Sequence, residues 1–480
     1  MARHPKILFL PLEIPAWERA RSLSYLAQLA FEEGFKANGI PWVTLPVFHG
    51  LPPSARSAWL RHARELCDGK QYDQVWVELV HSNLDEESLS WIASLALVRV
   101  GFIIESLQYD PEVYTIAPHL KSRQAQVEGQ LRYMTHAVCV DELDAADIAI
   151  RGLAAAIWWV SAVPERSIGA LPEPAPDKRA IFLGALYGER GAWLERHDLK
   201  ELLVQPRRSS EDGTEYPRLF DDLNHVMIGA LSEGGAIDRI LDPYLDALRL
   251  LRRECFALWL ERLKEGCAVV NLPSFFGGYP GRVYEAMAVG RPVISWEIPD
   301  RPRTKALFND GEEILLFPKD APGRLAEQIR RIQRDPDFAR QIAQNARRKL
   351  KQFHTVERRV REILDWVETC VEPTYGESAA APRSLHAPAI GTRANADDFC
   401  IKPGYTARLR PQYFQDAVPP GLVWQPHVYP LAALLARQFQ CTHIIDIGCG
   451  RAQKLAALHP EFQIIGIDCG DNLHFCRENY

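Results

Sequence analysis

The 480-residue sequence has little of what marks membrane, secreted and zinc-binding proteins. Its longest apolar run, "LAAAIWWVSAV" from Leu153, is about half the length needed to cross a bilayer. The run "ILFLPL" near the N-terminus is too short for a signal peptide, and Glu13 follows it. The 10 cysteines are scattered, with neither a C-x-x-C pair nor zinc-ligand spacing. We therefore expect a cytoplasmic protein without a transmembrane segment, at most in peripheral contact with a membrane.

An excess of positive charge is also missing. The formal net charge is -6, so nothing in the composition points to nucleic acid as a partner. The apolar content of 47% is ordinary for a globular protein, and the length predicts two or three domains rather than one core.

Short apolar runs alternate with amphipathic stretches along most of the chain, which predicts an α/β fold with parallel sheets. Expected strands in the first half cover residues 6–12, 41–47, 73–79, 98–106, 137–140 and 155–161. A second series of strands is expected after residue 178. It covers residues 179–188, 199–206, 266–273, 291–298 and 312–318. A largely helical stretch spans 218–265, and helices over 322–334 and 337–370 follow, the last with a break near His354.

Two segments rich in proline, alanine or glycine divide the chain. They predict a Rossmann-like domain over 1–172, a second over 173–371, a flexible linker over 372–397 and the start of a third α/β domain over 398–480.

The stretch "FGGYPGRVYEAMAVGRPVISW" (276–296) places a glycine bend directly before a short helix. Gly277, Gly278 and Gly281 allow a ligand to approach the backbone closely, and the helix start favours a phosphate. Arg282 and Glu285 share one helix face and suit a diphosphate and ribose hydroxyls, respectively. An ordinary turn with a surface ion pair is the alternative interpretation.

"GRVYEAMAVGRPVIS" resembles the donor-site motif of group-1 glycosyltransferases of the GT-B fold, closest to their spore-maturation-protein-like branch. The resemblance implies two Rossmann-like domains facing a cleft, a final helix that crosses back onto the first domain, and a nucleotide-diphosphate sugar as donor substrate. "FLGALYGERGAWL" (182–194) resembles the turn that touches the donor phosphates, and this role passes to Gly184 and Arg190. Arg282 and Arg190 would then offset the charge of the departing diphosphate.

The sequence departs from that family at one position. Many members carry a first glutamate eight residues before the second, and here that position is Gly277. The missing carboxylate would contact the donor sugar, so the sugar and the choice between retention and inversion stay open. No D-x-D motif stands at a strand end, and we expect no metal.

The acceptor, a glycan or small molecule, should meet the first domain where its strands end. Candidate residues there are Glu13, His49, His81 and Glu105. Glu105 follows four apolar residues, so we expect a raised pKa and the role of general base, with a loop or capping carboxylate as the alternative. Arg207 and Arg208 are further candidates for a phosphate contact, or part of a polar turn.

"HIIDIGCGRAQKL" resembles motif I of class I S-adenosylmethionine-dependent methyltransferases. The resemblance assigns cofactor contacts to Asp446, Gly448 and Gly450, and Asp468, at the end of the next strand, would accept the ribose hydroxyls. Another Rossmann nucleotide site, such as one for NAD, is the alternative. Only about two strands of a seven-stranded sheet are present, so we expect the chain to be part of a bifunctional glycosyltransferase–methyltransferase and not to methylate alone.

Two other functions stay open at this stage. One is a methyltransferase whose GT-B portion is an inactive scaffold, and the other is a GT-B nucleotide-sugar epimerase.

Overall fold

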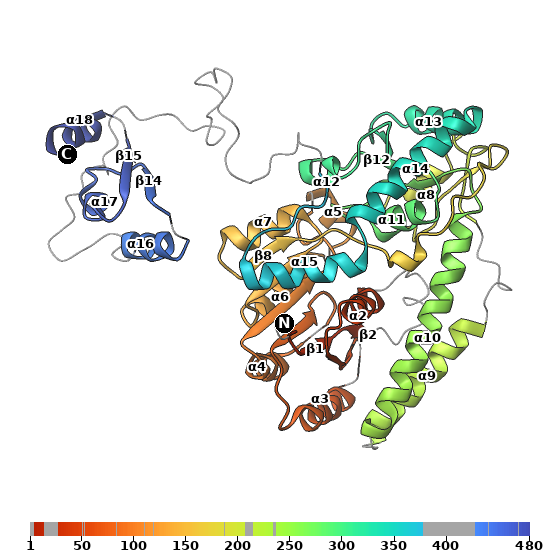
Figure 1. Ribbon diagram of the computed structural model, residues 1–480, viewed down its shortest axis with the longest axis horizontal. Helices are drawn as coiled ribbons and strands as arrows, with labels where there is room; N and C mark the ends of the chain where they lie inside the picture. Colours follow the sequence, from red (N-terminus) through yellow and green to blue (C-terminus); the bar gives the residue numbers. More distant parts are fainter. Residues whose placement is uncertain are drawn as a thin grey trace. The chain divides into compact units, whose positions relative to one another are not determined.

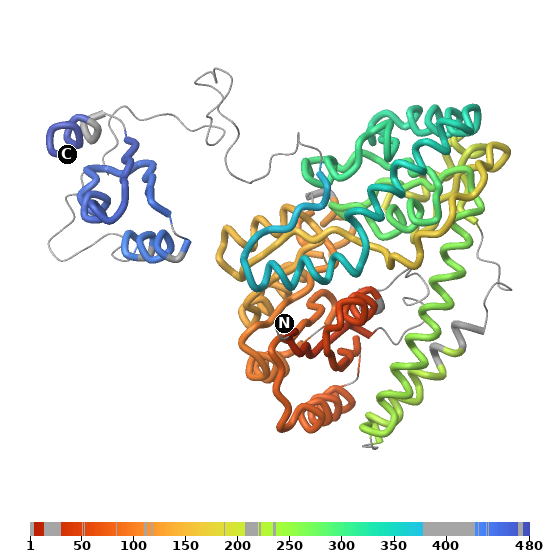
Figure 2. The backbone as a smooth tube through the Cα atoms, in the orientation of Figure 1, coloured from red at the N-terminus to blue at the C-terminus, as the bar shows by residue number. Residues whose placement is uncertain are grey.

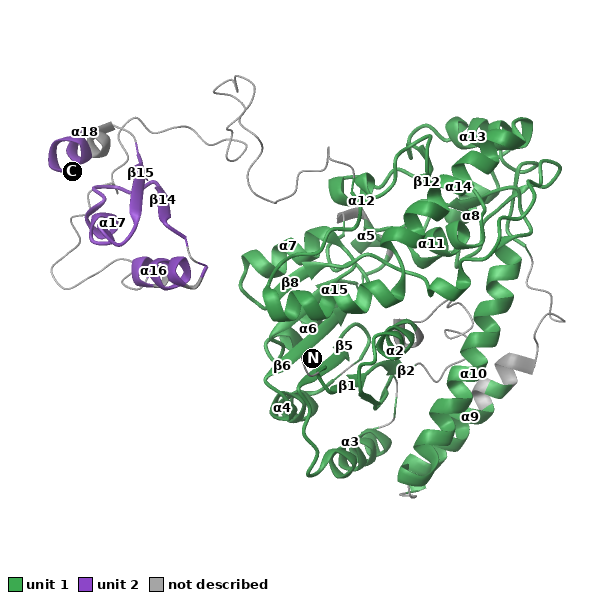
Figure 3. Ribbon diagram, viewed as in Figure 1, with its two compact units in different colours: residues 1–387 green, residues 388–480 purple. Residues whose placement is uncertain are grey.

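The structure is a computed structural model with two compact units, Met1–Ala387 and Pro388–Tyr480 (Figure 3). The residues that it describes are 4–13, 27–49, 51, 53–82, 84–109, 111–118, 120–186, 188–206, 215–233, 237–377, 428–439, 441–468 and 470–480.

The first unit begins with a lobe built on a six-stranded parallel sheet of order β3-β1-β5-β6-β7-β8. Its strands are β1 (Ile7–Leu10), β3 (Trp42–Thr44), β5 (Gln74–Glu78), β6 (Val98–Ile103), β7 (His136–Cys139) and β8 (Ala155–Trp158). The central strands β1 and β5 are buried along their whole length, as expected of apolar strands covered on both faces. The six strand regions predicted in this half of the sequence are confirmed.

Helices and a short strand pair complete this first lobe (Figure 1). The helices are α2 (Ala27–Ala37), α3 (Pro53–Cys67), α4 (Glu86–Leu95), α5 (Pro111–Ile116), α6 (Leu120–Leu131), α7 (Glu142–Ile150) and the 3-10 turn η1 (Glu165–Ser167). The short strands β2 (Leu12–Glu13) and β4 (Val47–Phe48) pair in parallel just beyond β1 and β3.

The second lobe contains a five-stranded parallel sheet of order β10-β9-β11-β12-β13. Its strands are β9 (Ala180–Ile181), β10 (Leu203–Val204), β11 (Val269–Asn271), β12 (Val293–Trp296) and β13 (Leu315–Phe317). Its helices are α8 (Arg190–Leu194), α11 (Gly281–Ala288), α12 (Pro302–Ala306), α13 (Gly323–Arg334) and α14 (Pro336–Phe353). The predicted α/β fold with parallel sheets is thus confirmed for this part of the chain.

Helices α9 (Glu215–Glu233) and α10 (Ile237–Leu263) pack against each other as a long hairpin between β10 and β11 (Figure 2). This confirms the helical stretch predicted over 218–265. The hairpin reaches the first lobe, where Arg249 of α10 binds Glu32 of α2 at 2.8 Å.

The last helices of the first unit break at the predicted residue. Helix α14 ends at Phe353, His354 is its C-cap, and α15 (Val356–Thr369) begins two residues later with Thr355 as N-cap. Helix α15 packs on α2 of the first lobe, where Val360 lies so close to Gly34 that an added Cβ would come within 2.3 Å of it. The predicted return of the chain to the first lobe is thus confirmed.

The segment after α15 corrects the predicted start of the linker at residue 372. Tyr375 is fully buried, and its hydroxyl donates to the carbonyl oxygen of Trp158 at 2.7 Å. Glu372 and Glu377 form ion pairs with Arg303. Composition suggested a flexible segment because alanine, proline and glycine are frequent in this part of the sequence, but one aromatic anchor and two carboxylates hold residues 372–377 on the first unit.

The second unit contains a two-stranded parallel sheet of β14 (His443–Ile447) and β15 (Gln463–Ile467). Its helices are α16 (Val428–Gln438), α17 (Gln453–Ala456) and α18 (Gly470–Asn479). One sheet face stays open among the described residues, since Ile445 and Ile447 are 59% and 81% exposed. A sheet of this size does not bury both faces, as the sequence predicted.

Candidate active site

The glycine bend leads into α11 as predicted. The helix begins at Gly281, and its N-cap, Pro280, offers no side-chain acceptor to the first amides. Pro280 has an extended backbone and ends the bend, while Gly290 follows the helix with a φ of 74°, a conformation that favours glycine.

Two arginines gather around one aromatic ring at the end of β9. The guanidinium carbons of Arg282 and Arg190 lie 5.0 and 5.4 Å from the centre of the Phe182 ring. A Cβ added to Gly184 would lie 2.8–2.9 Å from the Arg282 guanidinium, so glycine is needed there for this approach. The fold therefore brings Gly184, Arg190 and Arg282 together from positions almost 100 residues apart.

Backbone carbonyl groups hold the Arg190 side chain, which is fully buried. Its Nε donates to Pro273 at 3.2 Å and its Nη1 to Ala185 at 3.1 Å. These two hydrogen bonds hold the guanidinium group in one orientation.

Glu285 lies in the second turn of α11 and is 1% exposed. Its Oε2 accepts a hydrogen bond from the indole N–H of Trp259 on α10 at 2.7 Å. The indole orients the carboxylate from a helix that also contacts the first lobe. Its role toward ribose hydroxyls stays a prediction.

The glycines at 277 and 278 approach the first lobe closely. The amide of Gly277 donates to the hydroxyl of Ser106 at 2.8 Å, and a Cβ on Gly278 would lie 3.2 Å from the carbonyl oxygen of Val140. The glycine loop, residues 274–280, is thus in contact with the opposite lobe. Arg207 and Arg208 fall outside the described residues.

A cluster of polar side chains stands at the carboxyl edge of the first sheet. We call it the edge cluster; its members are His49, His81, Glu105, Tyr109 and Arg123. His81 binds Glu105 at 3.3 Å, and Arg123 binds both Glu105 and the Tyr109 hydroxyl, the latter at 3.1 Å. Nδ1 of His49 donates to the carbonyl oxygen of His81 at 2.8 Å.

His81 has a φ of 65°, in the left-handed region that non-glycine residues rarely adopt. Its side chain is 31% exposed, so the imidazole is held in the cluster and still reached by solvent. Backbone strain at a solvent-accessible histidine bonded to a carboxylate is typical of functional sites.

The predicted rise in the pKa of Glu105 is wrong. Burial raises the pKa of Glu105, but the hydrogen bond from His81 and the positive charge of Arg123 outweigh burial, and the pKa lies below the ordinary value for glutamate. The sequence showed the apolar residues before Glu105 and not the arginine 18 positions later. A carboxylate that stays ionised beside a histidine is suited to orienting that histidine rather than to taking a proton itself.

Sequence reasoning missed Glu78, the last residue of β5. Burial, together with the neighbouring carboxylates of Glu13 and Glu105, raises its pKa to about 8, despite the amide of Leu12, whose hydrogen bond lowers it. The nearby Glu13 is nearly fully buried and binds Arg252 of α10. The available signal was a glutamate inside the apolar strand "VWVEL".

In the second unit the predicted residues meet around a glycine turn. Gly448 and Gly450 have φ values of 83° and 59°, and the amide of Gly450 donates to Oδ2 of Asp468 at 2.6 Å. The Tyr429 hydroxyl donates to Asp446 at 2.5 Å. The strand ends, the turn and the carboxylate at 468 thus lie close together, and their role toward a cofactor stays a prediction.

Two kinds of feature are absent from the described residues. None of the helices there combines the length and apolar character of a membrane span. The same residues contain no group of three or more histidine, cysteine, aspartate or glutamate side chains arranged to hold a metal ion.

Residues 235–365, from α10 to α15, match the glycosyl transferase-like family model. No curated protein matches the chain.

Similar solved structures include sucrose-phosphate synthase from Thermosynechococcus elongatus, with 14% identity, coverage of 77% of this chain and 99% of that one, and a TM-score of 0.46. HepE from Anabaena in complex with UDP-glucose matches at 12% identity over 75% and 100% of the two chains, with a TM-score of 0.44. A glycosyltransferase from Rickettsia africae matches at 11% identity over 77% and 98%, with a TM-score of 0.43.

Proposed function

We propose that the first unit is a glycosyltransferase that moves a sugar from a nucleotide-diphosphate sugar to a glycan or small-molecule acceptor. The observation that carries this proposal is the pair of guanidinium groups at the Phe182 ring, those of Arg190 at the start of α8 and of Arg282 at the start of α11, the latter close against Gly184. The match of residues 235–365 to the glycosyl transferase-like model supports it.

The second lobe would hold the donor substrate. Arg282 and Arg190 offset the negative charge that develops on the diphosphate as the bond between its oxygen and the sugar breaks. The N-terminal amides of α11 add a further positive potential at the diphosphate. The Glu285 carboxylate accepts hydrogen bonds from the ribose hydroxyls, and the Trp259 indole holds this carboxylate in place. No metal enters this scheme.

The first lobe would hold the acceptor. His81 takes the proton of the acceptor hydroxyl as the new glycosidic bond forms, and Glu105 orients the imidazole and stabilises its charged form. Glu105 thus changes from the expected base to a positioning residue, because the positive charge of Arg123 helps keep it ionised.

The second unit would supply part of an S-adenosylmethionine site, so that the chain belongs to a bifunctional glycosyltransferase–methyltransferase. Asp468 would face the ribose hydroxyls, and the turn at Gly448 and Gly450 would leave room for the methionine part. S-adenosylmethionine is expected as a cofactor only where the methyltransferase domain is complete, and calorimetry on such a chain tests this, because Asp468→Ala should abolish the binding.

Incubation of the purified chain with a panel of nucleotide sugars tests the main proposal. UDP-glucose is the first donor to try, since HepE was solved with it. A transferase releases nucleoside diphosphate slowly by hydrolysis and faster with acceptor extracts. Binding without turnover would favour an inactive scaffold attached to a methyltransferase, and sugar interconversion without nucleotide release would favour an epimerase.

A further inference from the structure

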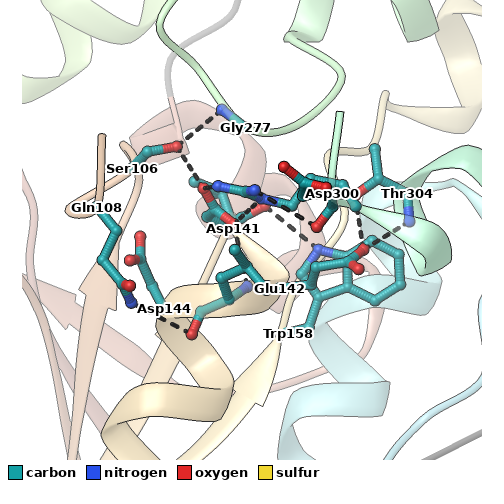
Figure 4. A network of polar contacts seen from close by, with 12 residues as sticks. Ser106, Gln108, Asp141, Glu142, Asp144, Trp158, Gly277, Asp300 and Thr304 are labelled. Carbon is teal, nitrogen blue, oxygen red and sulfur yellow. Dashed lines mark hydrogen bonds and ion pairs between the residues drawn. The ribbon is translucent and has the colours of Figure 1, made fainter. Parts of the chain in front are cut away.

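The contact between the glycine loop and the first lobe is built from charged and polar groups (Figure 4). The hydroxyl of Ser106 accepts the amide proton of Gly277 and donates its own to Oδ2 of Asp141 at 2.7 Å. Ser106 is 1% exposed and Asp141 is fully buried. The loop before α11 is thus bonded through one hydroxyl to a buried carboxylate of the other lobe.

Asp141 is held from both lobes. Arg301, in the second lobe, donates from Nε to Oδ1 at 2.7 Å and from Nη2 to Oδ2 at 3.0 Å. Within its own lobe Asp141 caps α7 by accepting the amide proton of Leu143 at 3.0 Å. Four hydrogen bonds therefore use both carboxylate oxygens, and a two-fold arginine–carboxylate contact of this kind fixes geometry strongly.

The next residue makes a second contact between the lobes. The Glu142 carboxylate accepts the amide protons of Arg303 and Thr304 at 3.2 and 2.6 Å, at the start of α12. Asp141 and Glu142 thus hold the glycine loop and the segment that begins α12 at the same time.

The space at residue 277 explains why a side chain is missing there. A Cβ built on Gly277 would lie 2.2 Å from Oδ2 of Asp141 and 2.8 Å from Nη2 of Arg301. Any other residue at 277 would push apart the ion pair. The related motif carries a glutamate at this position. Here the Asp141 carboxylate of the opposite lobe fills the space that such a side chain would need.

We propose that Asp141, Ser106, Arg301 and Gly277 form an interlobe latch that positions the glycine loop for turnover. Asp141 acts as a positioning residue in this latch, because four hydrogen bonds from protein groups engage both of its oxygens. The nucleotide contacts assigned to Gly184, Arg282 and Glu285 lie within the second lobe. Opening the latch should therefore slow the reaction and leave nucleotide affinity largely intact.

The latch is tested with Gly277→Ala, Ser106→Ala and Asp141→Asn in the full chain. Gly129→Ala is the matched control, because a Cβ added to that helical glycine meets nothing within 4 Å. Hydrogen–deuterium exchange followed by mass spectrometry should show peptides spanning 274–281 exchanging about tenfold faster in the three variants, the factor that one lost hydrogen bond gives. Exchange in the control should equal that of the unaltered chain.

The kinetic arm rests on the proposed function. With a nucleotide sugar that the unaltered chain turns over, kcat should fall about tenfold in Ser106→Ala and Asp141→Asn while the Kd for the nucleoside diphosphate changes less than twofold. Equal losses in kcat and nucleotide affinity would overturn the positioning role.

The hydrogen–deuterium exchange experiment needs no substrate. It therefore tests whether the latch holds the glycine loop even if the chain turns over no nucleotide sugar. Unchanged exchange at 274–281 in both Gly277→Ala and Ser106→Ala would overturn the latch. If Asp141→Asn or Gly277→Ala does not fold, as judged by circular dichroism, Ser106→Ala still decides, because it keeps the ion pair between Asp141 and Arg301.

Discussion

The two lobes of the first unit prepare their polar groups in different ways. In the second lobe Arg190 and Glu285 are almost fully buried, and backbone carbonyls or an indole hold them. In the first lobe His81 and Glu105 are 31% and 40% exposed and bind other side chains. The comparison teaches that the fold holds the charged groups of the second lobe in buried positions, whereas the histidine of the first lobe has a strained backbone and stays accessible to solvent. This difference fits the proposed division between holding a diphosphate and deprotonating an acceptor.

The largest effect is expected at His81. His81→Ala should lower turnover by about 10²–10⁴, the usual range for a lost general base, and leave nucleoside diphosphate binding unchanged because the nucleotide contacts are in the other lobe. Initial rates and calorimetry measure the two quantities. His197→Ala, at an exposed position of the second lobe, is the control. Full activity in His81→Ala would remove the edge cluster from the chemistry.

A second effect concerns stability and pH. The folded-state pKa of Glu78 is about 8, against an ordinary value of 4.5, so the unfolded chain releases this proton first as the pH rises. The free energy of unfolding should therefore fall between about pH 5 and 8, and Glu78→Gln should remove much of that fall. Denaturant titrations at several pH values measure it, with the exposed Glu254→Gln as control.

Part of the slope should remain in Glu78→Gln, since burial and the charge of Asp141 raise the pKa of Asp144 to about 8 as well. An identical slope in the unaltered chain and in Glu78→Gln would mean that Glu78 is ionised in the folded protein at neutral pH.

Glu285→Ala should weaken nucleoside diphosphate binding by roughly 1–3 kcal/mol, the size of a lost hydrogen-bond pair to a charged group. Titration calorimetry gives the affinity, and Glu285→Gln separates the charge from the shape of the side chain. Unchanged binding in both variants would move the ribose contact elsewhere.

The smallest effect is expected at Trp259. Trp259→Phe keeps an aromatic ring against α11 and removes the N–H that orients Glu285. Binding should weaken by about 0.5–1.5 kcal/mol, less than in Glu285→Ala. In the double variant with Glu285→Ala the indole change should add nothing further, and additive losses would show that the two residues act independently.

Much of the fold could be predicted from the sequence, because apolar runs, glycines and a helix break are local signals. The parallel strands, the α9–α10 hairpin and the break at His354 were all predicted. The residues in α11 were found together because they lie within one short motif. Their ligand roles stay predictions.

The features that could not be predicted depend on partners far apart in the sequence. His81 and Arg123 lower the pKa of Glu105, and Asp141 fills the space beside Gly277. Trp158 and Arg303 hold residues 372–377 in place. Periodicity and composition carry no information on such pairs.

The central claim is that the arginine pair beside Gly184 binds the diphosphate of a nucleotide sugar. Titration calorimetry of UDP and other nucleoside diphosphates into the unaltered chain and Arg282→Ala tests it most directly. Arg324→Ala is the control, because that arginine forms a surface ion pair with Glu327. We predict that one nucleoside diphosphate binds the unaltered and control chains equally and that Arg282→Ala loses about 1.5–3 kcal/mol. Equal affinity in Arg282→Ala and the unaltered chain would contradict the account.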